Sequence, residues 1–243
     1  MSRHNLFAIE TSTERLSLAI LRGERMHVRE INAGQRHSEL ALPLIHELLD
    51  EAALELKDID VFAFGQGPGS FTGVRIACGL TQGLALGADR PVMPVPTQMA
   101  LAEQCGAGKV VVAIDARMGE IYFAAYVRAN PAGEWRPAIA PLLVKPGELP
   151  ALGDGDWCGI GSGFDVPMLA SELTVRYGGQ IHRIVNGALP SARDVATIGA
   201  RRLAEHGIES ALAAEFAAPL YLRNKVAMTI TERAEHHLKK AAA

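Results

Sequence analysis

The sequence predicts an α/β protein in which one fold occurs twice, with a cleft between the two copies. The first observation is the order of elements before residue 98, which is three strands, a helix, a strand, a helix and a strand. The second is that a similar order begins again near Val110. This order is ribonuclease-H-like, and its duplication is the architecture of the actin, sugar kinase and Hsp70 group. We therefore expect two lobes of an actin-like ATPase fold, at residues 1–98 and 99–226.

The first lobe is predicted from short apolar runs that alternate with turn residues. Such runs indicate buried strands, at Leu6–Ile9, Leu16–Leu21, Met26–Ile31, Ile59–Phe64 and Val92–Val95. Apolar residues at helical spacing predict helices over Ser38–Leu54 and Phe71–Leu86. Ser70 or Thr72 can serve as the N-cap of the second of these helices.

The second lobe shows the same alternation. Its strands are predicted at Val110–Asp115, Ile121–Val127, Trp135–Ile139 with Leu142–Val144, Asp156–Ile160 and Ile181–Val185. Helices are predicted over Phe164–Leu173 and Ser191–His206, and the helix at 191–206 is a candidate to pack back on the first lobe. The polar, alanine-rich tail at 227–243 has no pairing pattern, so we expect it to be frayed.

Short matches between the two halves support the duplication. Ala8–Glu10 matches Ala113–Asp115, and Phe64–Gly67 matches Ile160–Gly163, in the same order along both halves. Each half therefore has an acidic residue at the end of its first strand and a Gly-x-Gly at the end of a later one.

Composition excludes several classes of protein. The net charge of −3 and the pI near 6.2 give no basic surface for strong nucleic-acid binding by this chain alone. The three cysteines are far apart and lack Cys-x-x-Cys spacing, which indicates reduced thiols rather than disulfides or a zinc site. The first ten residues lack the long apolar h-region typical of a signal peptide, and no apolar run approaches about 20 residues. We expect a cytoplasmic protein.

A glycine loop separates the strand at 59–64 from the helix at 71–86. It contains Gly65, Gly67, Pro68 and Gly69. A strand, a glycine loop and a helix can direct backbone N–H groups at an anion. The alternative is a tight turn that only brings the helix onto the sheet.

The acidic residues Glu10 and Asp115 stand where a phosphotransferase of this architecture holds Mg²⁺ and phosphate. With Thr11, Gly67 and Gly69 they form a candidate nucleotide site in the cleft. The second phosphate loop is degraded, because Asp115 is followed by Ala-Arg-Met-Gly. The alternative is that each acid caps or pairs locally at a strand end, since paired acids are only probabilistic markers of a site.

Histidine metal sites and nucleophilic hydrolysis have little support. His37 and His46 are nine residues apart and point to opposite faces of a helix, whereas helical ligand pairs need a spacing of three or four. We therefore predict no metal site. The chain also lacks a Gly-x-Ser-x-Gly elbow.

Two helices of the first lobe carry more apolar or small residues than one buried face requires. Each glycine inside a helix costs about 1 kcal/mol relative to alanine, which a chain tolerates where something approaches closely. The alternative is a helix deep in its own domain. We predict a helix–helix interface with another chain. Its candidate residues are Leu40, Leu44, Leu48, Phe71, Val74, Gly79 and Gly83.

Three motifs carry a resemblance to a known family. They are GPGSFTGVR at 67–75 with GLTQGLALG at 79–87, AIDARMGE at 113–120 followed by Tyr122, and PLYLR at 219–223. Together they resemble the TsaB (YeaZ) family over nearly the whole chain, from about Leu6 to Val226.

The resemblance implies a bacterial cytoplasmic subunit of the machinery that forms threonylcarbamoyladenosine at position 37 of tRNA. In that family the catalytic paralogue, TsaD, holds a metal through helix histidines and transfers the threonylcarbamoyl group. TsaB lacks those ligands and supports TsaD. The resemblance therefore implies a non-catalytic scaffold that contacts TsaD through its first two helices, here 38–54 and 71–86.

Further partners follow from the same resemblance. It implies a TsaE-type ATPase in the complex, a homodimer when the chain is alone, tRNA contact only through the complex, and no membrane. It implies that this chain holds no cofactor of its own and that ATP or ADP can bind at the interface of the complex. The peptidase label attached to relatives has no catalytic residues to support it here. The rival function is an actin-like ATPase or kinase that acts through Glu10 and Asp115.

Overall fold

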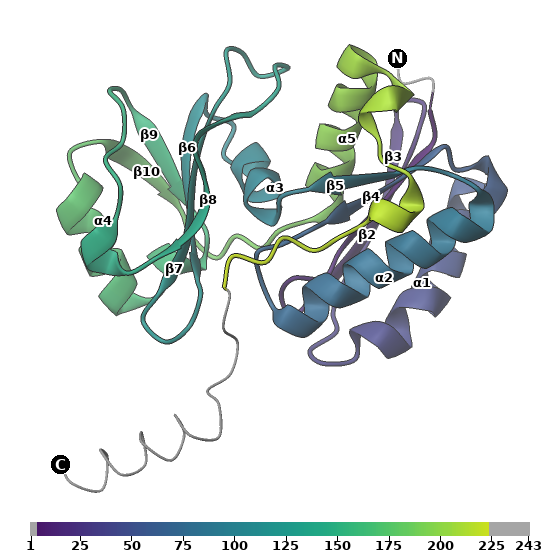
Figure 1. The fold of residues 1–243 in the computed structure, drawn as a ribbon, viewed down its shortest axis with the longest axis horizontal. Coiled ribbons are helices and arrows are strands. Elements are labelled where there is room, and N and C mark those ends of the chain that lie inside the picture. Colours follow the sequence, from purple (N-terminus) through teal and green to yellow (C-terminus); the bar gives the residue numbers. More distant parts are fainter. Residues whose placement is uncertain (1–3, 224–243) are drawn as a thin grey trace, which may run out of the picture.

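The computed structural model describes residues 4–223, which form two lobes, each built on a five-stranded sheet (Figure 1). The first sheet has the strand order β3-β2-β1-β4-β5. Its strands are β1 (Leu6–Glu10), β2 (Arg15–Arg22), β3 (Arg25–Asn32), β4 (Val61–Gly65) and β5 (Val92–Val95). The second sheet, read from its β8 edge, has the order β8-β7-β6-β9-β10. Its strands are β6 (Lys109–Asp115), β7 (Ile121–Val127), β8 (Arg136–Val144), β9 (Trp157–Ile160) and β10 (Ile181–Val185).

The two sheets have the same topology. In the first, β1 pairs antiparallel with β2 and parallel with β4, while β3 and β5 form the edges. In the second, β6 pairs antiparallel with β7 and parallel with β9, while β8 and β10 form the edges. The predicted duplicated ribonuclease-H-like fold is confirmed.

Helices cover the sheets unequally (Figure 1). They are α1 (His37–Ala52), α2 (Phe71–Ala88), α3 (Thr97–Gln104), α4 (Pro167–Tyr177) and α5 (Ala192–His206). Short 3₁₀ turns occur at η1 (Leu56–Asp58), η2 (Pro146–Glu148), η3 (Ser162–Phe164), η4 (Ile208–Ser210) and η5 (Ala214–Phe216). Figure 1 shows α1 and α2 on one face of the first sheet, α5 on its other face, α4 outside the second sheet, and α3 between the sheets.

Three apolar cores correspond to these layers. One lies between the first sheet and the helices α1 and α2, and another lies between the second sheet and α4. The third contains residues of both sheets together with α3 and α5, so it joins the two lobes. The helix at 191–206 therefore packs against the first sheet although it follows the second sheet in the chain.

Several local details differ from the sequence-based expectations. The segments Trp135–Ile139 and Leu142–Val144 belong to one strand, β8. The helix expected from Phe164 begins at Pro167, because residues 162–164 form the turn η3 first. The helix α3 was not expected, and the predicted lobe boundary at residue 98 falls inside it. The tail at 227–243 lies outside the described residues. Among residues 4–223, no helix combines the length and the hydrophobicity needed to cross a bilayer.

Candidate functional site

A cleft of about 1200 Å³ lies between the two lobes. The first lobe contributes the loop after β1, including Ser12, and the start of α2, including Gly69 and Ser70. The second lobe contributes Asp115 at the end of β6 and Ser162 in the turn after β9. The cleft therefore lies where the two copies of the fold present corresponding strand ends to each other.

The glycine loop that follows β4 packs tightly against the segment that follows β1. A Cβ at Gly69 would lie 2.5 Å from Ser12 Cβ, and a Cβ at Gly73 would lie 1.9 Å from the carbonyl oxygen of Thr11. Ser70 donates its backbone N–H to the Ser12 carbonyl at 2.8 Å, and its hydroxyl accepts from Gly73 N as the N-cap of α2. The structure therefore assigns these glycines a packing role in the first lobe.

Glu10 is buried behind the wall of the cleft and does not line it. Its carboxylate accepts from Ser12 N at 2.6 Å and from Thr97 Oγ1 at 2.9 Å. Gly65 makes room for it, since a Cβ there would lie 1.8 Å from Glu10 Oε2. Burial raises the pKa of Glu10, while the hydrogen bonds from Ser12 and Thr97 act in the opposite direction. The expectation that Glu10 faces the cleft is corrected: the side chain joins the loop after β1 to α3.

Thr11 and Gly67 are also withdrawn from the cleft. Thr11 is fully buried and donates its hydroxyl to the Gly73 carbonyl at 2.8 Å. Gly67 has a φ of +100°, which favours glycine, and its N–H donates to Thr97 Oγ1 at 3.2 Å. Both residues hold the first lobe together, and neither is among the residues that line the cavity.

Asp115 lines the cleft, but its carboxylate is engaged by its own loop. It accepts from the Arg117 backbone N–H at 2.8 Å and pairs with the Arg117 guanidinium at 3.1 Å. Arg117 and Met118 have φ values of +62° and +59°, a left-handed turn that non-glycine residues rarely adopt. Because Glu10 does not reach the cleft, the structure does not bring together the two acids that a Mg²⁺-dependent phosphotransferase requires.

Other cleft residues were missed by sequence reasoning. Ser12 Oγ and His37 Nε2 are buried in the cleft wall and have no hydrogen-bond partner among residues 4–223. Arg223 donates to the Ala116 carbonyl at 3.0 Å and pairs with Glu120, which ties the 219–223 motif to the AIDARMGE motif. The 219–223 motif was recognised by resemblance alone, because contacts across such a sequence separation leave no local pattern.

The predicted interface residues are divided between the core and the surface. Leu48 and Val74 are fully or almost fully buried in the described chain, so they cannot contact a partner directly, and that part of the expectation is corrected. Leu40 and Leu44 are half-buried against the core under α1. Phe71 is exposed and lies against Tyr221, with ring centroids 5.8 Å apart, and under the Arg75 guanidinium.

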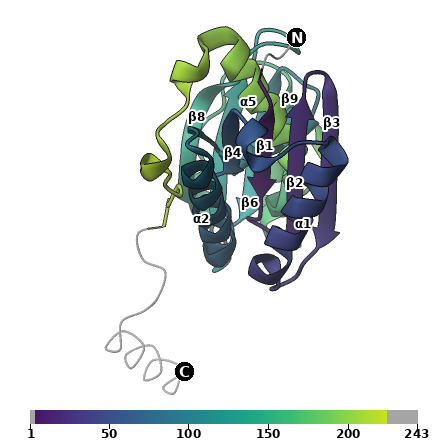
Figure 2. The ribbon, with the colours of Figure 1, turned by 90° about the vertical axis from the view of Figure 1, so that its right-hand side faces the viewer.

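The outward face of α2 has almost no side chains along its middle. Gly79, Gly83 and Gly87 are exposed, and apart from the neighbouring residues and backbone of α2 itself, a Cβ at any of them would meet no atom of residues 4–223 within 4 Å. Large apolar side chains are also exposed on these two helices, with Leu42 of α1 exposed by 54% and Leu86 of α2 by 59%. Figures 1 and 2 both show α1 and α2 beside each other on this face. We call Leu42, Gly79, Gly83, Leu86 and Gly87 the α1–α2 face.

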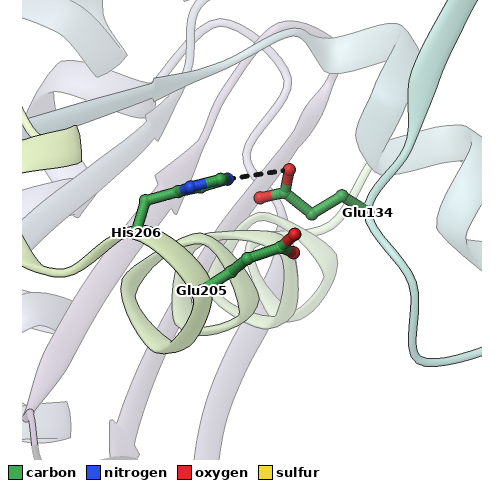
Figure 3. A group of neighbouring side chains, drawn as sticks. All are labelled: Glu134, Glu205 and His206. Atoms are coloured by element: carbon green, nitrogen blue, oxygen red, sulfur yellow. Dashed lines mark hydrogen bonds and ion pairs between the residues drawn. The ribbon is translucent and has the colours of Figure 1, made fainter.

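One group of side chains outside the cleft has metal-ligating chemistry. Glu134, Glu205 and His206 offer ligand atoms within 4.8 Å of one another, and His206 Nε2 lies 3.1 Å from Glu134 Oε2 (Figure 3). Burial lowers the pKa of the nearby Arg202, and the negative charge of Glu134 raises it. His206 pairs with Glu134, so we interpret the group as a pairing cluster between α5 and the loop before β8.

Comparison with known proteins identifies the family. Residues 30–231 match the family model described as TsaD, tRNA N6-adenosine threonylcarbamoyltransferase. The chain is 37% identical over 230 residues to the tRNA threonylcarbamoyladenosine biosynthesis protein TsaB of Escherichia coli, covering 91% of this chain and 96% of that protein. The Haemophilus influenzae TsaB is also 37% identical, over 238 residues, covering 93% and 96%.

Solved structures agree with this assignment. A Pseudomonas aeruginosa protein described as similar to the peptidase YEAZ superposes with a TM-score of 0.81 and 35% identity, covering 90% of this chain and all of that chain. The structure of YeaZ from Pseudomonas aeruginosa gives a TM-score of 0.77 and 34% identity over the same shares. Because the sequence relatives and the structures both span nearly the whole chain, this chain belongs to the TsaB (YeaZ) family.

Proposed function

We propose that this chain is a non-catalytic supporting subunit for a TsaD-type transferase that forms threonylcarbamoyladenosine at position 37 of tRNA. The names of its TsaB relatives and the match to a TsaD family model support a role in this modification. The chain acts in the bacterial cytoplasm and contacts tRNA only as part of the complex.

The observation that carries the proposal is the α1–α2 face. Glycines at 79, 83 and 87 lower the stability of α2 by about 1 kcal/mol each relative to alanine. No packing contact within residues 4–223 requires these glycines, because the space above them is open. A second helix packed here could approach the α2 backbone closely, while the exposed Leu86 of α2 and Leu42 of α1 would supply apolar contact area.

The same surface accounts for the further partners that the family resemblance implies. A second copy of this chain would cover the α1–α2 face when the transferase is absent, which gives a homodimer. A TsaE-type ATPase would join the complex of the two different subunits. ATP or ADP would then bind near the shared surface, with no cofactor held by this chain alone.

The rival function is an ATPase or kinase that acts through Glu10 and Asp115, and the position of Asp115 in the cleft favours it. The burial of Glu10 opposes it, because a metal-bound nucleotide would have only one of the two acids. Calorimetry of the isolated chain with Mg-ATP distinguishes the two functions. We expect no heat of binding at millimolar nucleotide, whereas binding that Asp115→Asn abolishes would support the rival.

The direct test of the docking proposal is Gly83→Lys. The long side chain projects from a position with open space above it, so the monomer should fold normally while a packed partner helix is displaced. We expect binding of a TsaD-type protein, measured by calorimetry, to weaken at least about tenfold, because a lysine in a close helix contact must be desolvated.

The matched control is Val175→Lys, at an 84% exposed apolar position of α4 on the second lobe. It introduces the same side chain on a helix outside the α1–α2 face and should bind as the wild type does. Unchanged affinity and unchanged tRNA modification with Gly83→Lys would contradict the proposal.

A further inference from the structure

Two buried cysteines that are distant in sequence meet at the junction between α3 and the second sheet. Cys105 directly follows α3, and Cys158 lies in the central part of the second sheet, on β9. Their Sγ atoms are 2.8 Å apart, and the two residues are 2% and 3% exposed. The third cysteine, Cys78, lies on α2 and has no sulfur partner among the described residues. The chain therefore holds one dithiol pair and one separate thiol.

The surroundings make the two thiols unequal. The Arg183 guanidinium, on the neighbouring strand β10, donates to the Cys105 carbonyl. The hydrogen bond between the two sulfurs, helped by the charge of Arg183, lowers the pKa of Cys158 to about 6. The hydrogen bond to Cys158 and burial raise the pKa of Cys105 well above its ordinary value. The charge of Arg183 therefore favours the thiolate form of Cys158, and a thiolate is the form of cysteine that attacks oxidants.

We propose that Cys105 and Cys158 form an oxidative modification site, at which a small hydroperoxide converts the pair to a disulfide. In the first step the Cys158 thiolate attacks the O–O bond and gives two electrons to the peroxide, which forms Cys158–SOH and releases the other oxygen as hydroxide from hydrogen peroxide or as alkoxide from an organic hydroperoxide. In the second step the Cys105 thiol displaces the hydroxyl group, which forms the S–S bond and releases water. A small peroxide is the appropriate oxidant class because the pair is buried from larger disulfide reagents.

The position of the pair gives the modification a structural consequence. At its start, α3 carries Thr97, which donates to Glu10 and accepts from Gly67 N in the first lobe. At its end, α3 leads directly into Cys105 beside β9 of the second lobe. A disulfide would covalently anchor one end of this connection, so oxidation would restrict the movement of α3 relative to the second sheet.

The test uses the purified full chain and hydrogen peroxide. After quenching with catalase, the protein is unfolded, alkylated with N-ethylmaleimide and measured by mass spectrometry. We expect peroxide to leave the wild type monomeric, with two fewer thiols that react with N-ethylmaleimide. The polypeptide itself should be two mass units lighter, because the disulfide forms with loss of two hydrogens. Digestion should give one cross-linked peptide pair that contains Cys105 and Cys158. Cys78 should remain alkylatable, and Cys78→Ser should form the same disulfide.

Two variants separate this pairing from general thiol oxidation. Cys105→Ser should stop at the sulfenic acid of Cys158, which dimedone traps. Arg183→Gln, at an exposed residue, should slow disulfide formation at least about fivefold, because less Cys158 thiolate is present. Arg136→Gln, on the opposite edge strand β8, should leave the rate unchanged. Three alkylatable thiols after peroxide, a cross-link through Cys78, or equal rates in the two arginine variants would overturn the proposal.

Discussion

The two lobes share one strand topology but differ in what connects their strands. In the first lobe the link from β3 to β4 contains α1, a helix of 16 residues. In the second lobe the corresponding link, from β8 to β9, contains only the short turn η2. The first lobe therefore has two helices on one face of its sheet, whereas the second has α4 alone. The two lobes thus have the same sheet topology and differ in their outer helices. The extra helix of the first lobe, α1, is part of the α1–α2 face, which is the surface proposed for a partner.

The acidic residues at the ends of the central strands show a second difference. Glu10 ends β1 and is buried against Ser12 and Thr97. Asp115 ends β6, lines the cleft and pairs with the exposed Arg117. Equivalent positions in the two copies thus have different roles: one carboxylate stabilises the inside of a lobe, and the other faces the space between lobes. Sequence alignment of the two halves shows the equivalence but not this divergence.

The largest expected effect tests whether α1 is integral to the first lobe. Leu48→Asp places a carboxylate at a fully buried position, where it removes apolar packing and must be desolvated. We expect the free energy of unfolding to fall by about 4 kcal/mol or more, measured by urea denaturation.

The matched variant is Leu42→Asp, on the exposed side of the same helix. It should change stability by less than about 0.5 kcal/mol and weaken binding of the transferase. If both variants were equally stable, α1 would be an appendage of the first lobe rather than part of its core.

A second prediction compares the glycines that follow β4 and β9. In the first lobe, a Cβ at Gly73 would lie 1.9 Å from the Thr11 carbonyl oxygen, which belongs to the backbone and cannot move away easily. In the second lobe, a Cβ at Gly163 would lie 3.0 Å from Ala113. We expect Gly73→Ala to cost about 3 kcal/mol and Gly163→Ala about 1 kcal/mol in thermal or urea unfolding. A larger loss at Gly163 would show that the second lobe, not the first, has the tighter loop.

These cases show which parts of the fold could be predicted from sequence. The strands Val92–Val95 and Ile121–Val127 were predicted with their observed bounds, because apolar runs bounded by turn residues are local signals. The helix α3 was missed because most of its residues are buried, so it lacks the amphipathic stripe that reveals a helix.

The candidate site was less predictable than the fold. The burial of Glu10 depends on Gly65 and on Thr97, which lies 87 residues away, and no local pattern records that contact. In α1 the apolar residues surround the helix, so the sequence could not distinguish buried Leu48 from exposed Leu42. The glycines of α2 were informative because a glycine inside a helix has an intrinsic cost that the sequence reveals, although which of them faces outward needed the structure.

A third prediction sharpens the contrast between the two acids. Burial raises the pKa of Glu10 above its ordinary value of 4.5, so the folded state holds this proton more tightly than the unfolded state does. The stabilisation that the folded state gains from this raised pKa is fully present below pH 4.5 and is lost as the pH rises through the folded pKa. Glu10→Gln mimics the protonated form, so its stability relative to the wild type should increase as the pH rises from 4.5 to 7. Urea titrations at several pH values measure this.

The second-lobe counterpart is Asp115→Asn. Its ion pair with Arg117 lies at the surface, so we expect a loss of at most about 1 kcal/mol at pH 7. Stability curves of Glu10→Gln that run parallel to those of the wild type across this pH range would show that the buried carboxylate is as easily ionised as in the unfolded chain.

The smallest expected effect concerns the glycines that distinguish α2 from α4, which contains none. Gly83→Ala adds a methyl group into open space and removes a flexible residue from a helix. We expect the isolated chain to gain about 0.5–1 kcal/mol in urea unfolding. Gly79→Ala should act in the same direction, whereas Gly73→Ala in the same helix acts in the opposite one.

A stability gain at Gly83 accompanied by weaker transferase binding would mean that this helix is less stable than it could be because a partner needs its bare surface. A loss of stability at Gly83 would instead mean that the glycine serves the monomer, and the main difference between the two lobes would need another explanation.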